Sequence, residues 1–236
     1  MTGTTLPISE TFVSIQGEGK LTGTPSWFVR VAGCNLRCAW CDTPYASWSP
    51  KGEPRTVEQL VAECHAHGLR HAVLTGGEPM IFEPITELSR ALADLDVHVT
   101  IETAGTVHRA VHCDLLSLSP KLANSTPNGD PRDPQGVWAQ RHEQRRLDFC
   151  ALRALLADHP ERQLKFVVGD PQDLPEIEAV LAELPEVLPQ DVLLMPEGVS
   201  VPDPDAQSWV LRACIERGWR FCTRLHIQLF GNLPGT

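Results

Sequence analysis

Residues 33–43 read Gly33-Cys-Asn-Leu-Arg-Cys-Ala-Trp-Cys-Asp-Thr43 and carry three cysteines, Cys34, Cys38 and Cys41, in the spacing C-x3-C-x2-C. A structural zinc site normally has four protein ligands, and a 4Fe–4S cluster normally has four cysteine ligands. The next cysteine, Cys64, falls in an expected helix, and no histidine follows the triplet closely. Three thiolates without a fourth protein ligand therefore indicate an iron–sulfur cluster whose open iron can bind a substrate or cofactor. A zinc or redox-active cysteine loop is the alternative.

Outside this loop, short apolar β-like runs alternate with helical patterns. In the helix expected over 56–67, Thr56 can cap the start and Gly68 can end the last turn. Alternating strands and helices predict an α/β fold with a mainly parallel sheet, in a single domain over residues 1–236. Strands are expected over 27–32, 71–74, 97–102, 115–118, 164–168, 192–195 and 220–225, and helices over 56–67, 84–95, 139–157, 172–184 and 204–217.

One stretch has no regular pattern. Residues 124–136 (NSTPNGDPRDPQG) are too rich in Pro, Asn and Gly for a helix or a strand. We expect a mobile loop or a lid there. It does not look like a domain linker, because the βα pattern resumes beyond it.

Four polar motifs each follow one of the expected strands. Because parallel strands end at the same edge, and ligands bind at that edge in α/β folds, we expect these motifs to form one site. Glycines let a ligand approach the backbone closely, and a carboxylate such as that of Glu78 can accept hydrogen bonds from an ammonium group. The motifs are Gly33-Cys34, Thr75-Gly-Gly-Glu-Pro79, Thr103-Ala-Gly105 and Ser119-Pro-Lys121.

Composition narrows the class of protein. The net charge of −10 argues against a non-specific grip on nucleic acid. No apolar run reaches the roughly 18 residues that a membrane span needs, and Met1–Ser9 does not resemble a signal peptide. We therefore expect a cytoplasmic protein with reduced thiols. Five cysteines outside the triplet are expected to be structural: Cys64, Cys113, Cys150, Cys214 and Cys222.

The triplet together with Gly76-Gly77-Glu78-Pro79 resembles the radical S-adenosylmethionine (SAM) superfamily. The resemblance implies a partial, modified (β/α) TIM-type barrel with a 4Fe–4S cluster on the three cysteines. It also implies that the open iron chelates SAM, whose cleavage starts a radical reaction, with Glu78 receiving the amino group of its methionine part. The SAM contacts that it implies are Trp40, Gly76, Gly77, Glu78, Gly105, Ser119, Pro120 and Lys121.

A longer resemblance, to the 7-carboxy-7-deazaguanine synthase (QueE) family, covers nearly the whole chain. It rests on the string from Glu10 to Gly19 (ETFVSIQGEG), the run Phe28 to Thr43, Glu102-Thr-Ala-Gly105 and the end segment from His226 to Asn232. The family implies ring contraction of 6-carboxy-5,6,7,8-tetrahydropterin to 7-carboxy-7-deazaguanine with release of ammonia, in queuosine and other 7-deazapurine biosynthesis. It also implies Mg²⁺, matched here by Thr43.

The residues suit a pterin that carries a carboxylate. Gln16 offers a hydrogen-bond donor and an acceptor, and Glu18 can accept from the N–H groups of the pterin ring. Arg30 can bind a carboxylate through two hydrogen bonds, although a structural salt bridge is its alternative role. His226 could donate to the same carboxylate or be a surface histidine. Segments 1–25 and 219–236 are expected to complete the site, and the implied substrate contacts are Ser14, Ile15, Gln16, Gly17, Glu18, Arg30, Thr103 and His226.

Two rival functions stay open at this point. A glycyl-radical activase would share the cysteine triplet, but it has no need of the SIQGEG string or Arg30. An iron–sulfur electron carrier would need four protein ligands and no cofactor pocket. For the synthase we expect a protein reductant such as flavodoxin or ferredoxin and a homodimer, neither of which a sequence pattern identifies.

Overall fold

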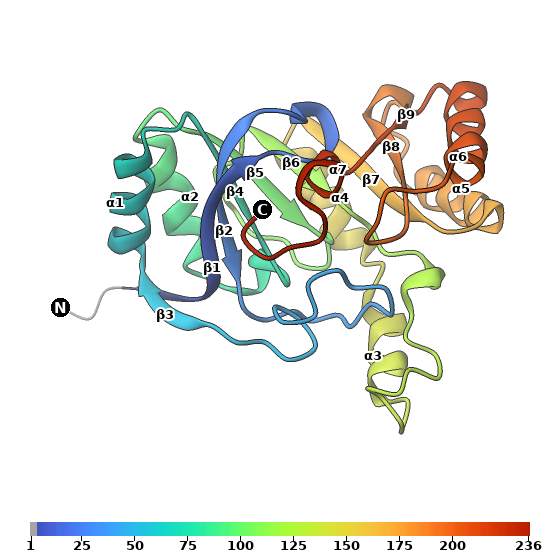
Figure 1. The fold of residues 1–236 in the computed structure, drawn as a ribbon, viewed down its shortest axis with the longest axis horizontal. Coiled ribbons are helices and arrows are strands. Elements are labelled where there is room, and N and C mark those ends of the chain that lie inside the picture. The colour runs from blue at the N-terminus through green and yellow to red at the C-terminus, as the bar shows by residue number, and fades with distance from the viewer. Residues whose placement is uncertain (1–3) are drawn as a thin grey trace.

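The computed structural model describes residues 4–236, apart from the side chain of Ala206. The first three residues of the expected substrate segment 1–25, which also begin Met1–Ser9, lie outside the described residues. The described chain forms a curved sheet with helices packed along its outer face (Figure 1).

The sheet has nine strands in the order β3-β1-β2-β4-β5-β6-β7-β8-β9. From β2 to β9 every neighbouring pair is parallel, while β1 runs antiparallel to both β2 and β3. This confirms the expected α/β partial barrel. The strands are β1 Thr5–Ile15, β2 Pro25–Val31, β3 Glu53–Thr56, β4 His71–Gly76, β5 His98–Thr103, β6 Leu115–Leu118, β7 Arg162–Val168, β8 Val192–Pro196 and β9 Arg220–Phe221.

Helices connect the parallel strands. The described residues contain α1 Val57–His67, α2 Ile85–Ala93, α3 Val137–Arg145, α4 Phe149–Asp158, α5 Leu174–Ala182, α6 Pro204–Arg217 and α7 Leu225–Phe230. The predicted caps of α1 are confirmed, since Thr56 accepts from Gln59 N–H in a capping box and Gly68 ends the helix at φ 65°. Among the helices in residues 4–236, none combines the length and the apolar character required to cross a membrane.

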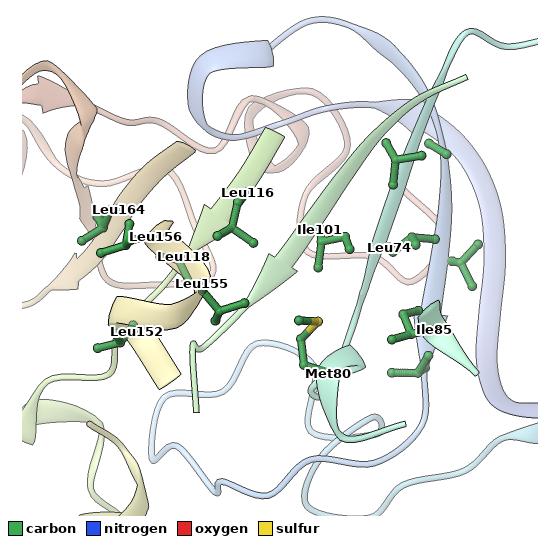
Figure 2. Close-up of a cluster of buried hydrophobic side chains, with 14 of the residues drawn as sticks. Leu74, Met80, Ile85, Ile101, Leu116, Leu118, Leu152, Leu155, Leu156 and Leu164 are labelled. Atoms are coloured by element: carbon green, nitrogen blue, oxygen red, sulfur yellow. The ribbon is translucent and has the colours of Figure 1, made fainter. Parts of the chain in front are cut away.

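The main core lies between the sheet and these helices. Figure 2 shows side chains of β4, β5, β6 and β7 meeting those of α2 and α4. Trp27, Phe166 and Leu116 are among the largest fully buried side chains. Because this core holds the parallel strands on their outer side, it fixes the positions of their carboxyl ends, where the polar motifs lie.

The structure corrects four expectations from the sequence. The helix expected over 139–157 is two helices, because Asp148 interrupts it and caps α4 by accepting from Ala151 N–H at 3.0 Å. The strand expected over 220–225 ends at Phe221, and Leu225 already begins α7. Strands β1 and β3 were not expected. Finally, residues 124–136 do not form an open lid, since they are hydrogen-bonded to the cysteine loop and lie outside the cavity lining.

Candidate active site

The four polar motifs meet at one edge of the sheet, as predicted. They follow β2, β4, β5 and β6, which are consecutive neighbours in the sheet. A cavity of about 440 Å³ opens at this edge. Most of the predicted site residues line it: Ile15, Gln16, Gly17, Glu18, Arg30, Cys34, Cys38, Trp40, Cys41, Thr43, Gly76, Gly77, Thr103, Ser119, Lys121 and His226.

The glycine motif after β4 packs directly against the start of the cysteine loop. Gly77 N–H donates to Val31 O at 3.1 Å, and Glu78 N–H donates to Gly33 O at 2.9 Å. A Cβ on Gly77 would lie 2.2 Å from Gly33 O and 2.7 Å from Ala46 O. Only a glycine therefore allows the two segments to approach this closely. The motif has a packing role that is independent of any ligand.

The cysteine loop offers sulfur ligands at the cavity wall. Burial raises the pKa of the Cys34 thiol to about 12, and it also raises the pKa of Cys38. Both thiols are neutral at pH 7 until a metal replaces their protons. Leu36 N–H donates to Cys34 Sγ at 3.4 Å, and Ser47 Oγ lies 3.1 Å from Cys41 Sγ, which are contacts typical of the surroundings of metal-bound thiolates.

The donor set suits a cluster better than a single ion. In residues 4–236, no three histidine, cysteine or acidic side chains are arranged to hold one metal ion. The three cysteines nevertheless border one cavity. A cluster of several irons is bulkier than one ion, so its ligands need not converge on a point, and the residues present fit a cluster with one iron facing the cavity.

Glu78 has a different setting from the one expected. Its side chain is fully buried and does not line the cavity. The carboxylate accepts from Thr103 Oγ1 at 2.6 Å and Ala104 N–H at 2.8 Å, so it joins the ends of β4 and β5. Burial raises the pKa of this carboxyl group. Its expected contact with a bound ammonium group therefore competes with hydrogen bonds that already stabilise the site.

Three further predicted residues lie outside the cavity lining: Ser14, Gly105 and Pro120. Ser14 pairs with Ser26 in the sheet, and only its chain neighbour Ile15 reaches the cavity lining. Gly105 adopts φ 74° where a Cβ would meet Leu152 at 2.4 Å. Its role is to let the chain turn over the core.

Gln16 and Glu102 form a polar wall of the cavity. Gln16 Nε2 donates to Glu102 Oε1 at 3.2 Å, and Thr75 Oγ1 donates to Glu102 Oε2 at 3.0 Å. Because both carboxylate oxygens accept a hydrogen bond, Glu102 fixes the orientation of the Gln16 amide. The free oxygen of Gln16 accepts from Glu18 N–H at 3.2 Å.

Glu18 lies in a positively charged corner of the cavity. Lys165 Nζ pairs with Glu18 Oε2, and Arg224 Nε lies 3.4 Å from Glu18 Oε1. Burial alone would raise the pKa of Glu18, but the charges of Lys165, Arg224 and His226 lower it to about 2. Burial would lower the pKa of Lys165, yet the carboxylates of Glu18 and Glu102 raise it overall. Glu18 is therefore an ionised acceptor.

Arg224 has unused donor capacity in this corner. Its side chain is 9% exposed. Its buried Nε has no hydrogen-bond partner among the described residues. Glu18 is therefore held closely by Lys165 and more loosely by Arg224.

The segment from Gln16 to Glu18 is closed by the C-terminal part of the chain. Leu225 N–H donates to Gly17 O at 2.8 Å. A Cβ on Gly17 would lie 1.9 Å from Nδ1 of His226, so the imidazole rests on the glycine backbone. Burial lowers the pKa of His226. His226 is thus a cavity residue and not the surface histidine of the alternative interpretation.

Arg30 reaches the cavity from β2 and is paired with Glu10 on β1. Its Nε donates to Glu10 Oε1 at 2.7 Å, and Tyr45 Oη donates to the same oxygen at 2.8 Å. The salt bridge of the alternative role is therefore present, and binding of a carboxylate stays a prediction. The salt bridge uses Nε and holds the guanidinium in place, while Arg30 still lines the cavity.

The remaining predicted residues form two small groups. Thr43 Oγ1 donates to Asp42 Oδ1 at 3.4 Å, and both residues line the cavity. Lys121 Nζ donates to Ser119 Oγ at 2.7 Å and lies 5.6 Å from the centroid of the Trp40 ring. Lys121 therefore lies at the cavity wall beside Trp40.

Sequence reasoning missed several cavity residues. Lys165 interrupts the apolar run Leu164–Val168, which is the same signal that singled out Arg30 on its strand. Thr75 and Glu102 belonged to quoted motifs without an assigned role. Segment 219–236 was expected to help form the site, and Arg224 and several residues from Asn232 to Thr236 do line the cavity, although none of them was singled out individually.

Comparisons with known proteins agree with this geometry. Residues 28–124 match the radical SAM superfamily. The chain is 50% identical over 232 residues to the 7-carboxy-7-deazaguanine synthase of Rhodopirellula baltica, covering 98% of this chain and 89% of that protein. It is 47% identical to the enzyme of the same name from Halobacterium salinarum, covering 99% and 94%.

The fold is also similar to a solved structure. The crystal structure of QueE from Escherichia coli superposes with a TM-score of 0.71 at 28% identity, over 94% of this chain and 95% of that one. Sequence identity of this extent along nearly the whole chain, with a similar fold and a radical SAM match that includes the cysteine loop, makes this chain a member of the 7-carboxy-7-deazaguanine synthase family within the radical SAM superfamily.

Proposed function

We propose that this chain contracts the ring of 6-carboxy-5,6,7,8-tetrahydropterin to 7-carboxy-7-deazaguanine and releases ammonia. Family membership makes it a radical SAM enzyme and a carbon–nitrogen lyase. One observation supports the substrate most directly. The same cavity contains the cysteine loop and a set of side chains complementary to a pterin and a carboxylate. We also propose that residues 1–236 act as a single domain.

The cofactors are assigned as follows. Cys34, Cys38 and Cys41 hold the 4Fe–4S cluster, and the cluster with bound SAM supplies the electron and the hydrogen-abstracting radical. Lys121, oriented by Ser119, faces the carboxylate of SAM, since an ammonium group attracts an anion in a partly buried site. The backbone at Gly76 and Gly77 lets the cofactor approach closely, and Trp40 borders it.

The substrate is bound by the opposite wall of the cavity. Glu18 is ionised and accepts from the N–H groups of the pterin, while Gln16, fixed by Glu102, recognises the adjoining amide edge. Arg30 and His226 bind the substrate carboxylate. The Thr43 hydroxyl would offer one oxygen to Mg²⁺, with water and substrate oxygens as its other ligands, and Asp42 would accept the hydroxyl proton of Thr43.

A turnover experiment tests the proposed reaction. Anaerobic protein reconstituted with iron and sulfide is mixed with dithionite, SAM, Mg²⁺ and 6-carboxy-5,6,7,8-tetrahydropterin. Liquid chromatography with mass spectrometry should detect 7-carboxy-7-deazaguanine and one ammonia per turnover. Cleavage of SAM without a ring-contracted product would refute the substrate assignment and leave the superfamily unaffected. Omission of Mg²⁺ tests the metal separately, and a rate that does not change would refute its role.

Replacing Arg30 with lysine should raise the KM for the substrate at least tenfold. Lysine keeps the charge opposite Glu10, but it lacks the planar fork that binds a carboxylate through two N–H groups. The visible spectrum of the cluster should not change, because Arg30 is not among its ligands. An unchanged KM, measured under saturating SAM, would show that Arg30 serves only the salt bridge with Glu10.

The other functional assignments are less specific. We propose a low-potential protein reductant such as flavodoxin or ferredoxin, a homodimer, and a cytoplasmic location. The exposed side chains of Leu211 and Ile215 on α6 are available for a subunit contact. Sedimentation equilibrium checks the dimer. The activase and electron-carrier alternatives are disfavoured, because neither function needs the polar cavity wall that contains Gln16, Glu18 and Arg30.

A further inference from the structure

Residues 124–136 and α3 together form hydrogen bonds to the cysteine loop, residues 34–41. We call residues 122–146 the brace segment. Arg37 N–H donates to Nδ1 of His142 at 3.1 Å, and Ala39 N–H donates to Ser125 O at 2.8 Å. Arg132 Nη2 donates to Ala39 O at 2.8 Å. Hydrogen bonds from the brace segment therefore hold the backbone of the loop between Cys34 and Cys41 on both sides of Cys38.

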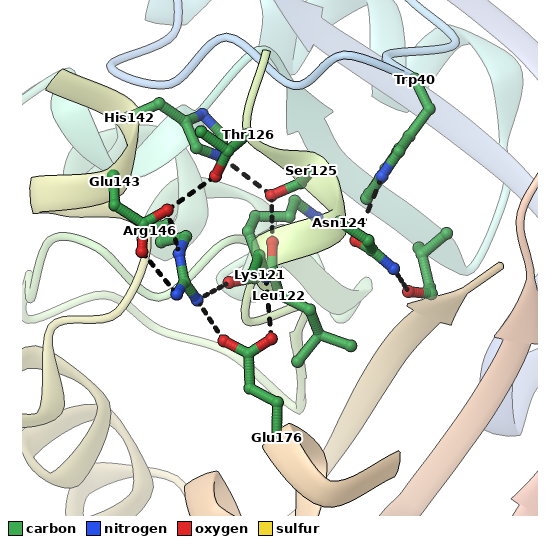
Figure 3. A network of polar contacts seen from close by, with 12 residues as sticks. Trp40, Lys121, Leu122, Asn124, Ser125, Thr126, His142, Glu143, Arg146 and Glu176 are labelled. Carbon is green, nitrogen blue, oxygen red and sulfur yellow. Dashed lines mark hydrogen bonds and ion pairs between the residues drawn. The ribbon is translucent and has the colours of Figure 1, made fainter. Parts of the chain in front are cut away.

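Hydrogen bonds define the protonation state of His142. The ring is fully buried. Nδ1 accepts from a backbone N–H, so the proton resides on Nε2, which lies 2.8 Å from Ser125 Oγ. Ser125 Oγ donates in turn to Leu122 O at 2.6 Å, and so it accepts from His142 (Figure 3). The neutral Nε2–H form of the imidazole is the one that satisfies every partner.

The brace segment is itself anchored to the rest of the fold. Arg146 pairs with Glu143 and Glu176, each at 2.6 Å, and donates to Lys121 O at 3.1 Å. Asn124 accepts from the Trp40 indole at 3.2 Å (Figure 3). α3 and Arg146 therefore link the cysteine loop to the segment that carries Ser119 and Lys121, and His142 contacts the loop backbone at the Arg37 amide.

The direction of the loop amides matters for an iron–sulfur cluster. Hydrogen bonds to cluster sulfurs and exposure to solvent help set its reduction potential. An N–H group aimed at sulfur stabilises the reduced, more negative cluster and so raises the potential. The amides of Arg37 and Ala39 flank Cys38, yet both donate to the brace segment. The amide of Leu36 is the neighbour that donates to a cysteine sulfur.

We propose that His142 is a positioning residue for the cluster, which keeps the reduction potential low by accepting the Arg37 N–H and holding it away from the cysteine sulfurs. The proposal rests on the cluster assignment to Cys34, Cys38 and Cys41 made above. It does not depend on the identity of the substrate. A low potential suits an enzyme whose cluster must pass an electron to SAM.

Two substitutions separate this role from simple packing. In His142→Asn the side-chain oxygen takes the place of Nδ1 and keeps an acceptor for Arg37 N–H. In His142→Gln the terminal amide instead reaches the place of Nε2, so the contact with Ser125 is kept and the acceptor for Arg37 is lost. Gln140→Ala, at an exposed position on the same helix, is the matched control.

The measurement is an anaerobic redox titration of the reconstituted proteins without SAM, followed by electron paramagnetic resonance of the reduced cluster. We expect a more positive midpoint potential and an altered g-tensor in His142→Gln, and wild-type values in His142→Asn and Gln140→Ala. Removal of iron by a chelator should be fastest in His142→Gln. Iron and sulfide analysis of the wild-type protein tests the cluster assignment separately.

Three outcomes would overturn the proposal. The first is a wild-type potential in His142→Gln. The second is an equal shift in both variants, which would indicate packing alone. The third is failure of both variants to assemble a cluster, because a purely structural role for α3 predicts that result. If His142→Gln alone fails to hold the cluster while His142→Asn retains it, the acceptor role is supported.

Discussion

Replacing Gly77 with alanine is expected to lower the free energy of unfolding by about 3 kcal/mol and to abolish cluster assembly. The added Cβ would lie 2.2 Å from Gly33 O and 2.7 Å from Ala46 O. Both contacts are with backbone atoms, so no side chain can move aside. To relieve the clash, the glycine motif and the cysteine loop must separate, which displaces Cys34 from the cavity wall.

Urea unfolding and the iron content after reconstitution measure the two effects. Gly169→Ala is the matched control, because its Cβ would meet only the end of the Glu197 side chain at 3.4 Å and it lies outside the cavity lining. This control should bind iron normally. Normal iron content in Gly77→Ala would show that the close approach is not needed for the cluster loop.

Replacing Lys165 with methionine should cost about 3 kcal/mol of stability and nearly all turnover, since it leaves a buried carboxylate with too little compensating charge. Lys165 pairs with Glu18, which Arg224 approaches only to 3.4 Å. The pKa of Glu18 is about 2 in the native site, below its ordinary 4.5. The stability from this pair is therefore fully present above pH 4.5 and is lost as the pH falls toward 2. In Lys165→Met, the free energy of unfolding should change less with pH between 4.5 and 2 than in the wild-type protein.

A double-mutant cycle distinguishes charge from packing. Adding Glu18→Gln to Lys165→Met removes the unpaired charge, so most of the lost stability should return while turnover stays low. Lys51→Met, at an exposed position, is the control for loss of a positive charge and should behave as wild type. If thermal unfolding shows that the stability losses of the two substitutions simply add, Glu18 and Lys165 are not a coupled pair.

The sequence predicted the parallel part of the fold well, because each of those elements carries its own pattern. Capping by Thr56, termination at Gly68 and alternating apolar runs are local signals. Strand β1 escaped prediction because its residues are mostly half-buried, and its place beside β2 is set by pairing and not by an apolar run. The break before α4 was missed although Asp148, its N-cap, is a residue type favoured at helix N-termini.

The site could be predicted where residues lie in motifs near one another in the chain. The cysteine loop and the glycine motif follow strands directly, so topology alone brings them together. Arg224 and Glu102 were not foreseen, because their importance depends on which distant side chain they face. The setting of Glu78 was also not foreseen, since its motif indicated a ligand contact but gave no sign that its carboxylate bonds to Thr103 and Ala104.

The join between the two ends of the chain has a consequence for biosynthesis. Gly19 N–H donates to the sulfur of Cys222, which is 203 residues away in the chain, and Leu225 N–H donates to Gly17 O. A ribosome therefore completes the cysteine loop long before it makes Arg224 and His226. Throughout most of translation the nascent chain contains the three cysteines but lacks the C-terminal residues that line the cavity. The cavity lining is complete only when the last helix docks.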